Sequence, residues 1–222
     1  MKIENTILKH YLRNVYFITG TSYAGKSTAV RMLADRYGLL CCEENYHMAV
    51  SELIATPETH PDICYNRSLT DWRDFVTRTP EEYERWIYAV GREAAEFEIP
   101  HLIAISQDRK VIADTNIPVD LLKEISDYTH VAVMLSPQSL SVDRFFDRTD
   151  PDKQFLLSVI DSCDDPAAVM ENYRRGLARI NSQEHYDEYA GSGFFTLVRK
   201  DPHADTREDV CNTLAKHFGW LS

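Results

Sequence analysis

The chain has 222 residues and a formal net charge of -11, with 44% hydrophobic and 27% charged residues. This length suits one α/β domain with a core of its own, and the composition is typical of a soluble protein. The negative charge disfavours general binding to nucleic acids or anionic membranes, because both would be repelled. No stretch is apolar enough to span a bilayer, and the first five residues lack the profile of a signal peptide.

The cysteines give no indication of disulfides or of a metal site. Their number is odd, and neither they nor the eight histidines show the paired spacing of metal ligands. We therefore expect reduced thiols in a cytoplasmic protein. The five cysteines are Cys41, Cys42, Cys64, Cys163 and Cys211.

Apolar runs and helical periodicity alternate along the chain, which is typical of a parallel sheet covered by helices on both faces. Short apolar runs predict five strands, at 15–19, 39–42, 111–113, 131–135 and 194–198. Apolar periodicity and capping residues predict helices that begin near residues 26, 80, 118, 137, 166 and 207, with a helical turn at 154–160. We expect these elements to form a single α/β domain over residues 1–222.

Capping residues and prolines set the expected ends of several helices. Gly38 follows the first helix and is expected to end it. Segments 79–82 and 206–209 have the spacing of capping boxes at helix starts. Pro100 is expected to begin a separate short helical segment, and residues 45–79 to be irregular apart from one weak helical patch.

The sequence between the first predicted strand and helix is Gly20-Thr21-Ser22-Tyr23-Ala24-Gly25-Lys26-Ser27-Thr28. It matches G-x-x-x-x-G-K-S, the Walker A pattern, in the strand–loop–helix context that this pattern requires. Glycines let the backbone turn around a polyphosphate, while amide N–H groups and the helix N-terminus attract the anion. Lys26 is expected to reach the β- and γ-phosphates and Ser27 to ligate Mg²⁺. An ordinary glycine-rich turn would need neither of these two side chains.

Asp114 ends the third apolar run, as the Walker B aspartate does in nucleotide-binding proteins. A carboxylate there can hold Mg²⁺ directly or through water, next to Ser27. The run Asp-Thr-Asn also suits an ordinary turn. The preceding Val-Ile-Ala run favours the metal-binding role.

Glu43 and Glu44 follow the second predicted strand, at the sheet edge where a ligand is expected. One of them could orient an acceptor hydroxyl and accept its proton. A pair of solvated charges is an equally weighted alternative. Adjacent side chains point in different directions, so at most one is expected to face the acceptor, and Glu44 enters the candidate catalytic set.

Two further segments carry arginines, and for each segment two interpretations remain open. In residues 137–175 they could bind the transferred phosphoryl group through their planar guanidinium, or form salt bridges with nearby aspartates. The acidic stretch around 147–153 offers little to anchor it in a core, so we expect a mobile lid. In residues 45–79, aromatic rings and arginines suit a ring-bearing or anionic acceptor, and equally suit packing. The lid candidates are Arg144, Arg148, Arg174 and Arg175.

In its motif and element order, the chain resembles the nucleoside and nucleotide kinase-like branch of the P-loop NTPases. This branch includes adenylate kinase-like enzymes, shikimate kinases and small-molecule phosphotransferases. The Walker A match is the one highly specific motif, whereas the element order covers nearly the whole chain. The resemblance implies a three-layer sandwich with a five-stranded parallel sheet in order 2-3-1-4-5 and a P-loop after the first strand. It also implies an acceptor-binding helical insertion at 45–100 and a lid at 137–175.

The resulting hypothesis is an ATP-dependent kinase that transfers the γ-phosphoryl group to a small-molecule acceptor. ATP would be bound by residues 20–28 and Arg174, and Mg²⁺ by Ser27 and Asp114. The candidate catalytic residues are Lys26, Glu44, Asp114, Arg144 and Arg148.

The alternative is a regulatory or assembly ATPase, in which residues 45–100 would offer an exposed partner surface instead of an enclosed acceptor pocket. A Ras-type GTPase is disfavoured because the N-K-x-D guanine motif is missing from the sequence. The acidic charge disfavours a polynucleotide-end kinase. The sequence leaves open the acceptor, the choice of nucleoside triphosphate and the oligomeric state, with a homodimer as one candidate assembly.

Overall fold

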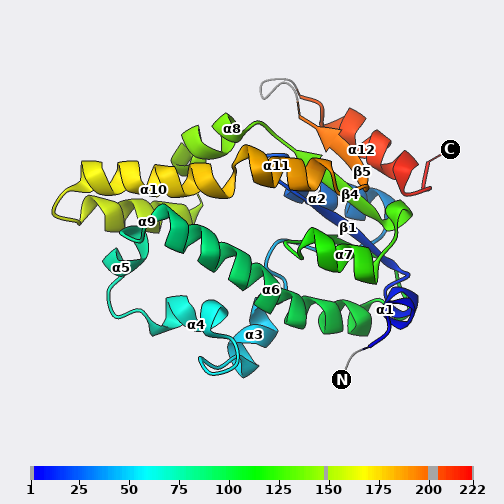
Figure 1. Cartoon of the computed structure of the whole chain (residues 1–222). Coiled ribbons are helices and arrows are strands. Elements are labelled where there is room, and N and C mark those ends of the chain that lie inside the picture. Colours follow the sequence, from blue (N-terminus) through cyan, green and yellow to red (C-terminus); the bar gives the residue numbers. More distant parts are fainter. Residues whose placement is uncertain (1–2, 148–149, 200–204, 222) are drawn as a thin grey trace.

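The centre of the computed structural model, which describes residues 3–147, 150–199 and 205–221, is one sheet of five parallel strands (Figure 1). The strand order is β2-β3-β1-β4-β5, and every pairing is parallel. The strands are β1 (Val15–Gly20), β2 (Leu40–Cys42), β3 (Val111–Asp114), β4 (Val131–Leu135) and β5 (Phe195–Val198). The expected sheet class, order and strand positions are therefore confirmed.

Helices make up most of the remaining described chain, and none of those described is long and apolar enough to cross a bilayer. The helices of the first half are α1 (Asn5–Tyr11), α2 (Lys26–Tyr37), α3 (Met48–Ile54), α4 (Pro61–Ser68), α5 (Arg73–Val76) and α6 (Pro80–Ile105). Those of the second half are α7 (Val119–Ile125), α8 (Gln138–Asp143), α9 (Pro151–Asp161), α10 (Pro166–Ile180), α11 (Gln183–Ala190) and α12 (Arg207–His217). Two short 3₁₀ helices are η1 (Tyr128–His130) and η2 (Phe145–Asp147).

The side chains of β1 alternate between two apolar cores, one on each face of the sheet. Tyr16 and Ile18 pack in a core that α2 and α12 complete, whereas Val15 and Phe17 pack in one that α6 and α7 complete. All six residues of β1 are buried. The sheet and its two helical layers therefore form the three-layer arrangement that the sequence predicts.

Helices α5, α9 and α10 lie away from the sheet (Figure 1), and a third apolar core lies between them and α6. Phe75 of α5, Tyr83 of α6, Ile160 of α9 and Leu177 of α10 are buried in it. Segment 137–175 is therefore anchored on the helices of segment 45–100. No described residue of the acidic stretch 147–153 belongs to this core, as expected, but the apolar side chains that flank the stretch pack between helices.

The helical region also differs from expectation in two places. Residues 45–79 contain α3, α4 and α5 instead of one helical patch. Pro100 lies inside α6 and does not begin a separate helix. The side chains of Phe97 and Leu102, on the two sides of this proline, are buried against the protein. This packing compensates for the helical hydrogen bond that proline cannot donate because it has no N–H. Outside these two places, the structure contains two helices, α1 and α11, that the sequence did not predict.

The capping predictions have mixed outcomes. Gly38 ends α2 in the left-handed conformation with φ of 65°, and Thr79 and Glu82 form the complete capping box of α6. Thr206 makes no side-chain cap at the start of α12, so the second predicted box is wrong. All five cysteines are free thiols, as expected.

Leu177→Ala is expected to lower the free energy of unfolding by about 2–5 kcal/mol, because it opens a cavity where α10 packs on α6. Urea denaturation measures this loss. Glu171→Ala, on the exposed side of the same helix, serves as the control and should change stability by less than about 0.5 kcal/mol. Equal effects of the two substitutions would show that the third core does not stabilise the fold.

Candidate functional site

The connection between β1 and α2, residues 20–25, is here called the glycine loop. Gly20 has φ of 125°, and a Cβ at this position would lie 2.0 Å from the carbonyl oxygen of Met134. Only glycine permits this approach of the loop to β4. The Thr21 N–H then donates to the same Met134 oxygen at 3.0 Å. Gly25, with φ of 94°, turns the chain into α2.

Two side chains at the start of α2 turn back toward the sheet edge. Lys26 Nζ donates to the carbonyl oxygens of Gly20 at 3.3 Å and Thr21 at 3.2 Å, so its ammonium lies against the glycine loop. Ser27 Oγ donates to Asp114 Oδ2 at 2.7 Å. The structure therefore brings together Lys26, Ser27 and Asp114, three residues that the sequence had placed in one site.

The Asp114 carboxyl is buried at the end of β3, with 1% of its surface exposed. Burial raises its pKa, although the nearby Lys26 charge and the Ser27 hydroxyl act in the opposite direction. Its second oxygen, Oδ1, is buried and has no hydrogen-bond partner. A cation or a cation-bound water is the kind of group that would satisfy this oxygen. Within the described ranges, no cluster of three or more His, Cys, Asp or Glu forms a metal site.

The residues that follow β4 hold the first half of the glycine loop. Ser136 N–H donates to Thr21 Oγ1 at 2.7 Å, and Ser136 Oγ donates to the Ser22 carbonyl at 2.5 Å. Ser141 of α8 donates to the same carbonyl at 3.2 Å. Ala24, in the second half of the loop, is buried in the core beside α2. These contacts fix the loop before any ligand binds.

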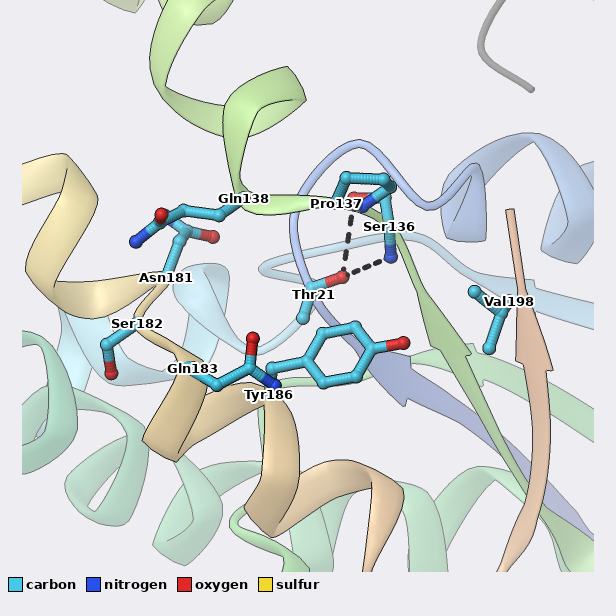
Figure 2. A pocket seen from close by; sticks show the side chains of 9 residues that line it. All are labelled: Thr21, Ser136, Pro137, Gln138, Asn181, Ser182, Gln183, Tyr186 and Val198. Atoms are coloured by element: carbon cyan, nitrogen blue, oxygen red, sulfur yellow. Dashed lines mark hydrogen bonds between the residues drawn. The ribbon is translucent and has the colours of Figure 1, made fainter. Parts of the chain in front are cut away.

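Two cavities adjoin the glycine loop, one beside Thr21 and the other beside Ala24 and Gly25. Figure 2 shows the smaller, about 360 Å³, lined by neutral polar side chains such as Thr21, Ser136 and Gln138. The larger, about 670 Å³, lies between α2 and α12 and is lined by Thr28, Met32 and other side chains. Thr28 thus faces a cavity large enough for the base and sugar of a nucleotide.

Two cations that the sequence analysis did not select lie at the glycine loop. Arg199, which follows β5, donates from Nη1 to the Tyr23 carbonyl at 3.0 Å. Lys153 of α9 places its ammonium 5.8 Å from the centre of the Tyr23 ring. Arg199 could have been found by extending the sheet-edge argument to the end of the fifth strand. Nothing in the local sequence points to Lys153.

The candidate lid arginines have different positions. The Arg144 carbonyl accepts a hydrogen bond from the Tyr23 hydroxyl, and its exposed side chain has no ion pair with any described residue. Arg174 is exposed on α10, and no hydrogen bond or ion pair among the described residues joins it to the loop. Arg175 donates to Asn172 at 3.3 Å. Arg148 lies outside the described residues.

The two acidic residues after β2 have different partners. Glu43 forms an ion pair with Arg31 of α2 at 3.3 Å. Glu44 accepts a hydrogen bond from Asn116 Nδ2 at 3.3 Å, beside the end of β3. Of the two, Glu44 is the one linked to the segment that carries Asp114.

All three arginines of residues 45–79 have structural partners. Arg78 stacks on aromatic rings of the third core, 4.2 Å from the centre of the Phe75 ring. Arg67 donates to the carbonyl groups of Glu52 and Ala55, and Arg73 pairs with Asp71. These contacts favour the packing interpretation of this segment over the acceptor interpretation.

No protein-family model matches the chain, and neither do the curated proteins or the solved structures with which it was compared. The interpretation of the site therefore depends on the motif and on the geometry described above.

Asp114→Asn is expected to raise the free energy of unfolding of the ligand-free protein by about 0.5–2 kcal/mol at pH 7. The amide oxygen can still accept the bond from Ser27, while a buried charge is removed. Because the folded-state pKa of Asp114 is raised, wild-type stability increases as pH falls through the folded value. The difference between variant and wild type should therefore close as pH approaches about 4, the value in the unfolded chain.

Urea denaturation at pH 7 and pH 4.5 measures this difference. Asp143→Asn, at an exposed position, is the control and should leave stability nearly unchanged at both pH values. A difference that does not depend on pH would contradict the assignment of a buried charge at Asp114.

Proposed function

We propose that the chain is an ATP-dependent phosphotransferase that transfers the γ-phosphoryl group of ATP to a small-molecule acceptor with the help of Mg²⁺. The observation that carries this proposal is the meeting of Lys26, Ser27 and Asp114 at the glycine loop. A lysine held against a tightly turned loop, next to a serine bonded to a buried carboxylate, suits a bound polyphosphate and its metal.

In the proposed complex, the phosphates lie in the curve of the glycine loop, at the N-terminus of α2. Backbone N–H groups and the positive end of the helix attract the anion. The Lys26 ammonium, which contacts the carbonyl groups of Gly20 and Thr21, would turn to the β- and γ-phosphates. The base and sugar would occupy the larger cavity between α2 and α12.

The residues that would hold Mg²⁺ are Ser27 and Asp114. Their donor atoms are oxygens, which Mg²⁺ prefers, and the unpartnered Oδ1 of Asp114 provides a position for an ion or its water. When bound, Mg²⁺ neutralises charge that develops on the phosphoryl oxygens. Substrate phosphates and water would complete its coordination.

On the acceptor side, Glu44 is the candidate to orient the acceptor hydroxyl and take its proton. Glu44 extends from the end of β2, and its link to Asn116 directs it toward the metal-binding edge. Arg199 and Lys153 contact Tyr23 of the loop, and the Tyr23 hydroxyl donates to the Arg144 carbonyl, so these three residues are further candidates to reach a transferred group. Such charges stabilise a phosphoryl group most strongly when water is excluded.

The experiment that tests the function measures ADP release from Mg²⁺·ATP, with and without a panel of small hydroxyl, amine and phosphate acceptors. Phosphotransferase activity predicts ADP release that depends on the acceptor, with an equal amount of phosphorylated product. ADP and phosphate release that no acceptor accelerates would favour the regulatory ATPase instead.

Lys26→Ala is expected to lower Mg²⁺·ATP turnover by more than about a hundredfold, the scale for removing one preorganised charge from a developing phosphoryl group. The free energy of unfolding should stay within about 0.5 kcal/mol, because this side chain contacts the loop and not a core. Lys123→Ala on α7 is the matched control, since this lysine is exposed. A folded Lys26 variant with wild-type turnover would refute the phosphate-binding role.

The segment closest to the loop is expected to become ordered when nucleotide binds. Ser141 and the carbonyl of Arg144 already contact the loop, so hydrogen exchange in α8 and η2 should slow when a non-hydrolysable ATP analogue and Mg²⁺ are added. Amides of α4, which lie in the helical extension, serve as the control. If amides of residues 20–28 gain protection while those of α8 do not, the lid assignment is wrong.

A further inference from the structure

Glu98 lies on the side of α6 that faces the sheet, and only 2% of it is exposed. Its Oε2 atom accepts two hydrogen bonds, from the Tyr46 hydroxyl at 2.7 Å and from Thr115 Oγ1 at 2.6 Å. The other oxygen, Oε1, lies 3.7 Å from Nδ1 of the buried His47. Nothing in the local sequence around Glu98 marks it as a site residue.

Both hydroxyl donors belong to turns that carry proposed site residues. Thr115 directly follows Asp114, and its N–H donates to the Ile18 carbonyl at 3.0 Å. The same Thr115 hydroxyl accepts from the Ile117 N–H at 3.0 Å, which fixes the turn after β3. Tyr46 lies in the turn after β2, two residues beyond Glu44. One carboxylate oxygen thus connects these two turns to each other and to α6.

Stability alone does not explain a carboxyl group at this position. Burial raises the pKa of Glu98, the hydrogen bonds from Thr115 and Tyr46 act in the opposite direction, and the carboxyls of Asp114 and Glu44 add to the effect of burial. An apolar side chain could pack with Ala95 and Leu102, which are buried on the same helix. Buried ionic groups of this kind are often less stabilising than apolar replacements of similar size.

We propose that Glu98 is a positioning residue that holds the turns after β2 and β3 in register, and so sets the positions of Glu44 and Asp114. This inference rests on the proposed function. Glu98 itself contacts neither the glycine loop nor the reacting groups, and it acts through the two hydroxyls. Its bond with Thr115 fixes the turn that carries Asp114, and its bond with Tyr46 fixes the turn that carries Glu44.

The first experiment measures hydrogen exchange in the ligand-free protein and does not depend on activity. Glu98→Leu removes the shared acceptor, so amide exchange in residues 43–47 and 115–117 should accelerate at least tenfold. Glu98→Gln keeps an oxygen acceptor of the same shape and should stay within threefold of wild type. Glu96→Leu, an exposed carboxylate on the same helix, is the control.

The second experiment measures the Mg²⁺ concentration at half-saturation for binding of a non-hydrolysable ATP analogue. Glu98→Leu and Thr115→Val should raise it at least tenfold, whereas Tyr46→Phe should raise it less than threefold, because Tyr46 acts on the Glu44 turn. Binding of the analogue in EDTA should stay unchanged in every variant. Glu98→Gln should restore the wild-type value.

If Glu98→Leu exchanges like wild type in both turns, or if it does not change the Mg²⁺ dependence, the positioning role is refuted. If Glu98→Leu does not fold, Tyr46→Phe tests the same role in the turn after β2, because it removes only the bond to Glu98, whereas Thr115→Val also removes the bond from the Ile117 N–H and tests the Thr115 hydroxyl as a whole. Failure of wild type and Glu96→Leu to bind the analogue would instead refute the proposed function. In that case the exchange measurement still decides whether Glu98 fixes the turns.

Discussion

The placement of β1 between β3 and β4 is the constraint on which the rest of the candidate site depends. Its register pairs Ile18 with Asp114 on one side and Gly20 with Met134 on the other. The glycine loop therefore leaves the sheet beside the end of β3. A shift of one residue in the first pairing would turn Asp114 to the opposite face and separate it from Ser27. The apolar side chains of β1, which fill two cores, prevent such a shift.

The third core changes how the helical half of the protein can move. Helices α9 and α10 pack on α5 and α6 through buried aromatic and aliphatic side chains, including Phe75 and Tyr173. Segments 45–100 and 137–175 are thus held together and cannot move independently without opening this core. Helix α8 packs on this core through Val142, and hydrogen bonds from Ser141 and to the Arg144 carbonyl also link it directly to the glycine loop. A movement that accompanies ligand binding would therefore involve α8 before α9 or α10.

The sheet and the centre of the site could be predicted from sequence because their determinants are local. Four consecutive residues are enough to recognise the apolar run that ends in Asp114, and the glycine loop is recognised by the fixed spacing of its glycines and lysine. The continuation of α6 through Pro100 was not predictable, because it depends on burial of the flanking side chains against distant parts of the chain. Glu98 was missed for a similar reason. Its partners, Tyr46 and Thr115, lie 52 and 17 residues away along the chain.

The charge distribution at the sheet edge opposes the stability of the folded chain. Glu98 and Asp114 are both buried there, and burial raises the pKa of each. Glu44 adds a third carboxyl group, and Lys26 is the cation whose charge acts against this accumulation at Asp114. The apolar cores on the two sides of the sheet show that this chain can fill its interior without charges.

Under the proposed function, a divalent cation held by Asp114 and Ser27 would offset this repulsion, because like charges repel most strongly where water is excluded. In that proposal, the cation would relieve at Asp114 part of the cost in stability that the buried carboxyl groups impose on the free protein. The same reasoning connects Glu98 to the site. A carboxyl group that fixes the turns after β2 and β3 must lie beneath both of them, and this position brings Glu98 close to Asp114.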